Sequence, residues 1–155
     1  MKKLFQEMAR LLSEQRSFVV ATIISSHGSS PRTAGAKMVV NSDGGVVGTI
    51  GGGRLEAEAI SRAGDVFQSR KGCTYPFSLK GEDVAGMDMI CGGSGEVLLD
   101  FIDAEAADNG CVFQGATEVM DRGENAWLLT FLDWEQPRVG SARHSLVKAD
   151  GIILG

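Results

Sequence analysis

The sequence predicts an α/β or α+β domain in which helices pack on a mixed sheet that contains β-hairpins. Apolar runs typical of strands alternate with segments whose apolar residues recur every three to four positions, as in helices. A second observation is that the last third repeats the pattern of the first third, which indicates an internal duplication. The chain has 155 residues, of which 43% are hydrophobic, so one domain or two very small ones can build a real core.

The first half predicts a helix, a strand, a hairpin and a second helix, in that order. Residues 2–16 carry apolar side chains at helical spacing, and residues 18–24 are a β-branched apolar run typical of a buried strand. Strands at 37–40 and 46–50 flank an Asp-Gly pair, which favours a hairpin because glycine readily takes positive φ. After a run of three glycines, residues 55–67 return to a helical pattern.

The second half predicts two further strands and a helix before the repeated pattern begins. The strands lie at 73–79 and 96–102, and the segment from Gly81 to Gly95 between them looks irregular. Residues 104–122 carry a weaker helical pattern.

The duplication covers a helix, a strand, a loop and a hairpin. The matching pieces are residues 127–132 with 18–24, Pro137-Arg138 with Pro31-Arg32, and residues 144–154 with 36–47. Two ordinary hairpins that look alike are the alternative explanation. If the duplication is real, residues 17–48 and 127–155 share one topology.

Composition excludes several classes of function. The formal net charge of −5 argues against bulk binding to nucleic acid or to an anionic membrane, which both need a basic surface. No apolar run approaches the roughly 20 residues that span a bilayer, and the charged N-terminus is unlike a signal peptide. Cys73, Cys91 and Cys111 are odd in number and widely spaced, which argues against a disulfide framework or a zinc site. We therefore expect a cytoplasmic protein with reduced thiols.

The first candidate motif is the glycine loop Gly48-Thr-Ile-Gly-Gly-Gly-Arg-Leu-Glu56, between a predicted strand and a predicted helix. Helix N-termini present free N–H groups, and glycine lets a ligand approach the backbone. The motif is neither a Walker A loop nor a dinucleotide fingerprint. A tight turn is the alternative, but Gly51, Gly52 and Gly53 exceed what we expect a turn to need. We predict that their N–H groups bind an anion and that Glu56 fixes the loop by capping.

The second motif places Cys91 directly before Gly92 and Gly93. Backbone N–H groups there can point at sulfur and lower the pKa of the thiol, and a thiolate suits a soft metal or sulfur chemistry. A buried apolar cysteine is an equally good interpretation. For Cys73 and Cys111, whose neighbours are apolar, we favour the buried apolar state.

The third motif runs from Gly28 to Lys37 and combines two serines with the charges of Arg32 and Lys37. These residues form a plausible phosphate clamp, with a solvated loop as the alternative. His27 and His144 are the only histidines, and no metal-ligand or triad spacing includes them, so a zinc hydrolase or a triad enzyme has little support. We expect His27 to be a polar loop residue.

The ordered set of motifs resembles the N-terminal domain of the xanthine dehydrogenase accessory factor family, also called the XdhC/CoxI family. The pieces that carry the resemblance are Gly28-Ser-Ser-Pro-Arg32, Gly35-Ala-Lys-Met38, Asp43-Gly44, Gly48-Thr-Ile-Gly-Gly-Gly-Arg-Leu-Glu56 and Met89-Ile-Cys-Gly-Gly93. Each piece alone is weak, whereas their order and spacing are specific. The weaker duplicate extends the match to the end of the chain.

The resemblance implies a chaperone for molybdenum cofactor rather than an enzyme. Such a protein binds the cofactor as cargo, protects its sulfurated form and helps insert it into a molybdenum hydroxylase such as xanthine or carbon monoxide dehydrogenase. The pterin phosphate suits the glycine loops, and molybdenum or its sulfur suits Cys91. The implied cofactor-binding residues are Cys91, Gly92, Gly93, Gly51, Gly52, Gly53, Glu56, Arg32 and Lys37.

Two other functions stay open at this point. One is a sulfur-transfer or nucleotide-dependent oxidoreductase component, and the other is an adaptor that recruits a hydroxylase or a cysteine desulfurase without binding cofactor. Whether the chain forms a homodimer is also open. Family members usually continue into a C-terminal Rossmann-like domain, so we expect residues 1–155 to be an N-terminal domain, as the front part of a longer protein or a stand-alone version.

Overall fold

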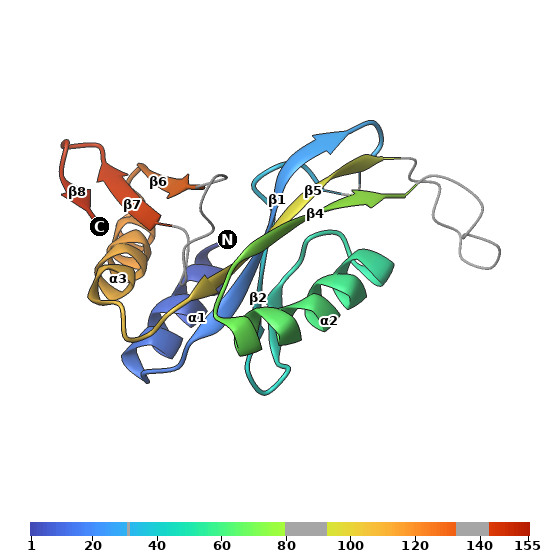
Figure 1. Ribbon diagram of the computed structural model, residues 1–155. Helices are drawn as coiled ribbons and strands as arrows, with labels where there is room; N and C mark the ends of the chain where they lie inside the picture. The colour runs from blue at the N-terminus through green and yellow to red at the C-terminus, as the bar shows by residue number, and fades with distance from the viewer. Residues whose placement is uncertain (31, 80–92, 133–142) are drawn as a thin grey trace.

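The structure is a computed structural model that describes residues 1–30, 32–79, 93–132 and 143–155 (Figure 1). Its elements are α1 (Lys2–Ser13), β1 (Phe18–His27), β2 (Lys37–Asn41), β3 (Val46–Gly48), α2 (Gly53–Ser69), β4 (Cys73–Ser78), β5 (Ser94–Ile102), α3 (Ala107–Asp121), β6 (Ala126–Phe131), β7 (Arg143–Lys148) and β8 (Ile153–Leu154). Every predicted helix and strand is found near its predicted position. The segment predicted to be irregular lies largely outside the described residues.

The strands form two sheets. The larger has five strands in the order β3-β2-β1-β5-β4, and the smaller has three in the order β6-β7-β8. Every strand pair among the described residues is antiparallel, so the fold class is α+β. The parallel pairing that a mixed sheet needs does not occur in this part of the chain.

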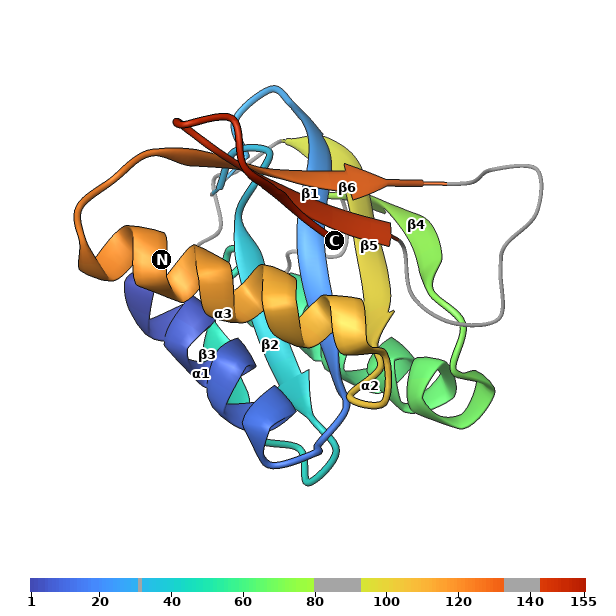
Figure 2. The ribbon, with the colours of Figure 1, turned by 90° about the vertical axis from the view of Figure 1, so that its left-hand side faces the viewer.

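Strand β1 lies in the middle of the larger sheet and is buried on both faces. Val19, Ala21 and Ile23 pack against α2 on one face, whereas Phe18 and Val20 pack against α1 and α3 on the other. This double burial explains why the strand is a continuous apolar run rather than an alternating one. Figure 2 shows α1 and α3 side by side across the second face.

The predicted duplication is confirmed as a shared topology. The order α1-β1-β2-β3 recurs as α3-β6-β7-β8, and both strand sets are antiparallel meanders. The two hairpin turns also share three hydrogen bonds. In the first turn, Asn41 N donates to Gly45 O, Gly44 N to Asn41 O, and Gly45 N to Asp43 Oδ1. In the second turn, the corresponding bonds run from Lys148 N to Ile152 O, from Gly151 N to Lys148 O, and from Ile152 N to Asp150 Oδ1.

The two copies differ in how their outer faces are covered. In the first copy α2 covers the β1 face that includes Val19 and Ala21. In the second copy the corresponding side chains of β6 are Trp127, Leu129 and Phe131, which are 61%, 42% and 50% exposed. Helix α3 packs on the opposite face of this sheet, so the second copy keeps an apolar outer face open among the described residues.

The matched turns give a test of the duplication. Gly44 and Gly151 have φ values of 83° and 86°, and a Cβ added to either meets no atom within 4 Å. The cost of Gly44→Ala and of Gly151→Ala is therefore backbone strain alone, about 1–2 kcal/mol of unfolding free energy in each case. Urea unfolding measures both losses, which we expect to agree.

Gly64→Ala is the matched control, because Gly64 lies inside α2 with open space around its Cβ position. Helix propensity predicts that this change raises the unfolding free energy by about 0.8–1 kcal/mol. If only one of the two turn variants is destabilised, the second turn does not carry the same conformational constraint.

Candidate functional site

The glycine loop is a strand-to-helix turn that needs all three of its glycines. It joins β3 to α2, and Gly51, Gly52 and Gly53 have φ values of 135°, 80° and 54°. These values lie in the region that favours glycine, because other side chains are strained there. The expectation that three glycines exceed what a turn needs is therefore wrong, and the glycine count alone does not indicate a ligand.

The Glu56 carboxylate fills this turn. Its Oε1 accepts hydrogen bonds from Thr49 Oγ1 at 2.5 Å, Gly52 N at 2.8 Å and Ile50 N at 3.1 Å. The N–H of Gly51 donates to Thr49 Oγ1 at 3.2 Å. Glu56 thus fixes the loop, and an internal anion already occupies two of the N–H groups near the expected ligand position.

The same contacts keep Glu56 ionised. Burial alone would raise the pKa of this carboxyl, but the hydrogen bonds from Thr49, Gly52 and Ile50 outweigh burial and hold the pKa below its ordinary value. The turn therefore places a fixed negative charge at the start of α2, where the helix dipole favours it.

The loop of residues 28–36 contacts Gly93, and Lys37, the residue that follows this loop, contacts the start of the glycine loop. At one side, a Cβ added to Gly93 would come within 2.7 Å of Ser30 N, so this approach needs a glycine. At the other side, the loop ends at Lys37, whose carbonyl accepts the Thr49 N–H at 3.2 Å. Antiparallel pairing of β1 with β5 produces this arrangement, since His27 lies opposite Ser94.

The structure brings only some of the predicted site residues close to one another. Gly51, Gly52, Gly53 and Glu56 share the glycine loop, Arg32 is exposed in the loop of residues 28–36, and Gly93 is buried against that loop. Cys91 and Gly92 lie outside the described residues. The Lys37 ammonium is not brought to the glycine loop, because its side chain enters the interior and donates to Thr22 Oγ1 at 2.9 Å.

The expectation for the other two cysteines is wrong. Cys73 and Cys111 are both exposed, not buried in the core. Cys73 lies on the same face of β4 as the buried Tyr75 and Phe77, but it is the first residue of the strand and its side chain stays exposed there. Partial burial still raises the pKa of the Cys73 thiol, so its exposure does not make it a ready thiolate.

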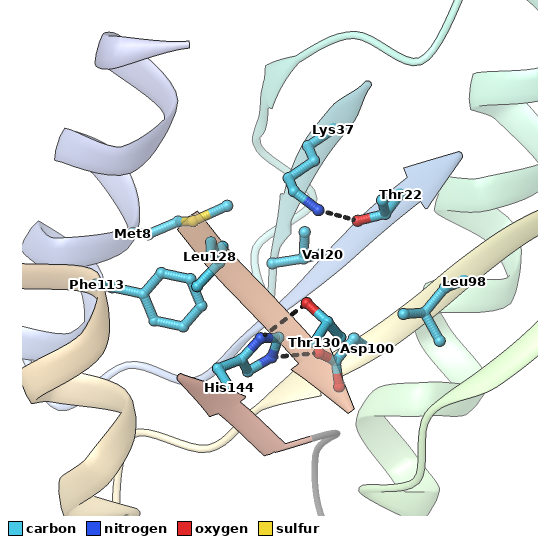
Figure 3. A pocket seen from close by; sticks show the side chains of 10 residues that line it. All are labelled: Met8, Val20, Thr22, Lys37, Leu98, Asp100, Phe113, Leu128, Thr130 and His144. Atoms are coloured by element: carbon cyan, nitrogen blue, oxygen red, sulfur yellow. Dashed lines mark hydrogen bonds and ion pairs between the residues drawn. The ribbon is translucent and has the colours of Figure 1, made fainter. Parts of the chain in front are cut away.

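A buried polar cluster that sequence reasoning missed lies between the two copies (Figure 3). His144 Nε2 is 2.7 Å from Asp100 Oδ2, and only 7% of the His144 side chain and 3% of the Asp100 side chain are exposed. His144 Nδ1 lies 3.2 Å from Thr130 Oγ1. A signal was present in the sequence, because Asp100 is a single charge inside the apolar run from Val97 to Ile102, and a buried charge needs a partner.

Neither a metal cluster nor a membrane span emerges from the part of the chain that the structure describes. In residues 1–30, 32–79, 93–132 and 143–155, no three His, Cys, Asp or Glu side chains gather as metal ligands. Within the same ranges, no helix has the length and apolar character to cross a bilayer.

In a comparison with known proteins, the first copy and both of its loops match a protein family. Residues 11–77 match the XdhC and CoxI family, from the end of α1 through β1, β2, β3 and α2 into β4. The resemblance noted from the motifs is thereby confirmed, and the matched XdhC/CoxI segment includes the glycine loop and the loop of residues 28–36.

Individual relatives agree with this assignment. The chain is 38% identical over 98 residues to the uncharacterized protein YqeB of Escherichia coli, across 62% of this chain and 18% of that protein. It is 31% identical over 85 residues to a Bacillus subtilis protein whose name describes a probable component of xanthine dehydrogenase, across 55% of this chain and 26% of that protein.

A solved structure shares the fold of this chain. The crystal structure of a xanthine dehydrogenase from Bacillus halodurans matches 97% of this chain with a TM-score of 0.71 and 26% identity, across 44% of its own length. The chain thus spans less than half the length of each of these relatives.

The ionised Glu56 predicts a pH-dependent stability. Its folded pKa is lowered, so its stabilisation is full above the ordinary value of 4.5 and is lost as pH falls through the lower folded pKa. Glu56→Ala should cost about 1–2 kcal/mol of unfolding free energy at pH 7, since charged hydrogen bonds are partly screened here, and less near about pH 3. Urea unfolding at the two pH values measures this difference.

Glu58→Ala is the control for this variant. Glu58 lies on the same helix and pairs with Arg62 across one turn, at 2.9 Å, with both side chains well exposed. Removing such a pair should cost less than about 0.5 kcal/mol. An equal loss for Glu56→Ala at both pH values would show that the loop does not depend on the charge of Glu56.

Proposed function

We propose that this chain binds molybdenum cofactor and delivers it, in sulfurated form, to a molybdenum hydroxylase such as xanthine or carbon monoxide dehydrogenase. The chain acts as a maturation chaperone, with the cofactor as cargo rather than as a resident group. Arg32 and the backbone of the glycine loop bind the pterin phosphate, and Cys91 contacts molybdenum or its sulfur.

One observation carries this proposal. Ser30 approaches Gly93 at one side of the loop of residues 28–36, and Lys37, which follows this loop, accepts the Thr49 N–H at the other side, so motifs far apart in sequence lie at one end of the sheet. In this arrangement, a single ligand that carries both a phosphate and a soft metal would contact the glycine loop and the segment around Cys91 at the same time. Two of the relatives are named for xanthine dehydrogenase, which supports a hydroxylase as the client.

The direct test is retention of cofactor by the purified protein. After incubation with molybdenum cofactor and removal of the free fraction, we expect pterin and molybdenum to stay with the protein in substantial proportion. Cys91→Ser should reduce retention by at least about tenfold, because even outer partners of metal ligands contribute that much. Fluorescence of the oxidised pterin and metal analysis measure the result.

Cys73→Ser and Cys111→Ser are the matched controls, because both remove an exposed thiol away from the proposed site. Their retention should equal that of the unaltered protein. A folded protein that retains no pterin contradicts the proposal. If it also captures a hydroxylase or a cysteine desulfurase, it is an adaptor, and if Cys91 turns over labelled sulfur without cofactor, it is a sulfur-transfer component.

A second prediction concerns the reactivity of Cys91. Its position before two glycines lowers the pKa of the thiol in our interpretation, and one pKa unit corresponds to about tenfold more thiolate. We expect iodoacetamide to modify Cys91 about threefold to tenfold faster than Cys73 or Cys111, which serve as internal references. Peptide mass spectrometry over time measures the three rates, and bound cofactor should protect Cys91. Equal rates would remove the activated thiolate from the proposal.

A further inference from the structure

The contact between the two copies has a matched pair of polar residues at its centre. Lys37 lies opposite Thr22 in the first copy and donates to its hydroxyl at 2.9 Å. His144 lies opposite Thr130 in the second copy, and its Nδ1 is 3.2 Å from that hydroxyl. The duplication therefore places a basic side chain and a threonine from each copy at corresponding positions.

Asp100 of β5 joins these two pairs. Its carboxylate contacts His144 Nε2 at 2.7 Å and lies near enough to Lys37 to act on its ammonium. Burial lowers the pKa of Lys37, and Asp100 opposes this effect by raising it. Figure 3 shows the His144 imidazole directed at Asp100 and Thr130, and the Lys37 ammonium directed at Thr22.

The cluster is packed too tightly to be a ligand pocket. The cavity that it lines, together with Met8 and Phe113, measures about 10 Å³. That volume holds roughly one water molecule, far below what a cofactor or substrate needs. The buried charges of the cluster therefore act on the protein itself.

The backbone of Lys37 connects this cluster to both site loops. Its carbonyl accepts the Thr49 N–H at 3.2 Å, and a Cβ added to Gly48 would come within 2.7 Å of that carbonyl. The loop of residues 28–36 ends directly before it, where Ala36 O accepts the Ile23 N–H at 3.0 Å. The side chain of Lys37 thus faces the second copy while its backbone holds the glycine loop.

We infer that His144 is a positioning residue for the glycine loop and acts on it through Asp100 and Lys37. The second copy thereby orders the loop that the proposed function assigns to the pterin phosphate. The identity of that ligand rests on the proposed function, whereas the ordering of the loop does not. The path has three steps: a hydrogen bond from the imidazole to the Asp100 carboxylate, the small cavity that Asp100 and Lys37 both line, and the hydrogen bond of the Lys37 carbonyl with Thr49 N–H.

Hydrogen exchange of the loop amides tests this inference without any cofactor. The amides of Thr49, Ile50 and Gly52 are the reporters, because each has a defined acceptor: the Lys37 carbonyl for Thr49 and the Glu56 carboxylate for the other two. The amides of Ala63 and Val66 in α2, on the opposite face of the sheet, are the references. His144→Ala should speed exchange of the reporters by about threefold to tenfold relative to the references.

His144→Gln should restore exchange to within about twofold of the unaltered protein, because an amide N–H can still donate to Asp100. Equal acceleration of the reporter and reference amides by His144→Ala would overturn the inference, since it would indicate a loss of global stability alone.

A double-mutant cycle with Lys37→Met tests the path itself. In that background the connection from Asp100 to the loop is broken, so a further His144→Ala change should leave the reporter amides unaffected. A full effect of His144→Ala in both backgrounds would show that the coupling bypasses Lys37 and would overturn the path. The cofactor-retention assay is separate, so a protein that binds no pterin but passes this cycle contradicts only the proposed function.

Discussion

Burial of strand β1 on both faces is the constraint on which the rest of the structure depends. Its apolar side chains fill two cores at once, one beneath α2 and one beneath α1 and α3. Because β2 and β5 both pair with it antiparallel, the end of β1 fixes where the loop of residues 28–36 starts and where Gly93 approaches that loop. The pairing of β1 with β2 and β5 therefore places the loops of the candidate site at the same end of the sheet.

The second copy repeats this architecture but uses it differently. Its inner face closes over the first copy around a polar centre formed by Asp100 and His144, where burial makes each polar group depend on its hydrogen-bond partner. Its outer face, which includes Trp127 and Ile153, stays open among the described residues. Duplication thus gives one chain two related units, of which one holds the loops and the other supports them through buried polar contacts.

The sequence predicted the elements well because periodicity and turn chemistry are local. The Asp-Gly turns at Gly44 and Gly151 and the buried run of β1 could be recognised without knowing the fold. The pairing of Asp100 with His144 could not, since it joins residues 44 positions apart in different sheets. The glycine run was misjudged for another reason, because pattern alone does not reveal that each glycine has positive φ.

The position of Glu56 sets a physical condition on any anion at the glycine loop. Its carboxylate already accepts the N–H groups of Ile50 and Gly52, so a phosphate that uses the same donors must first displace it. Displacement leaves an ionised carboxylate beside an incoming anion, which is repulsive unless a cation compensates. Arg54 of the glycine loop and Arg32, exposed in the loop of residues 28–36, are described cations near this position in the sequence. An anion at the glycine loop therefore needs both a displacement of the Glu56 carboxylate and a cation to balance the two negative charges.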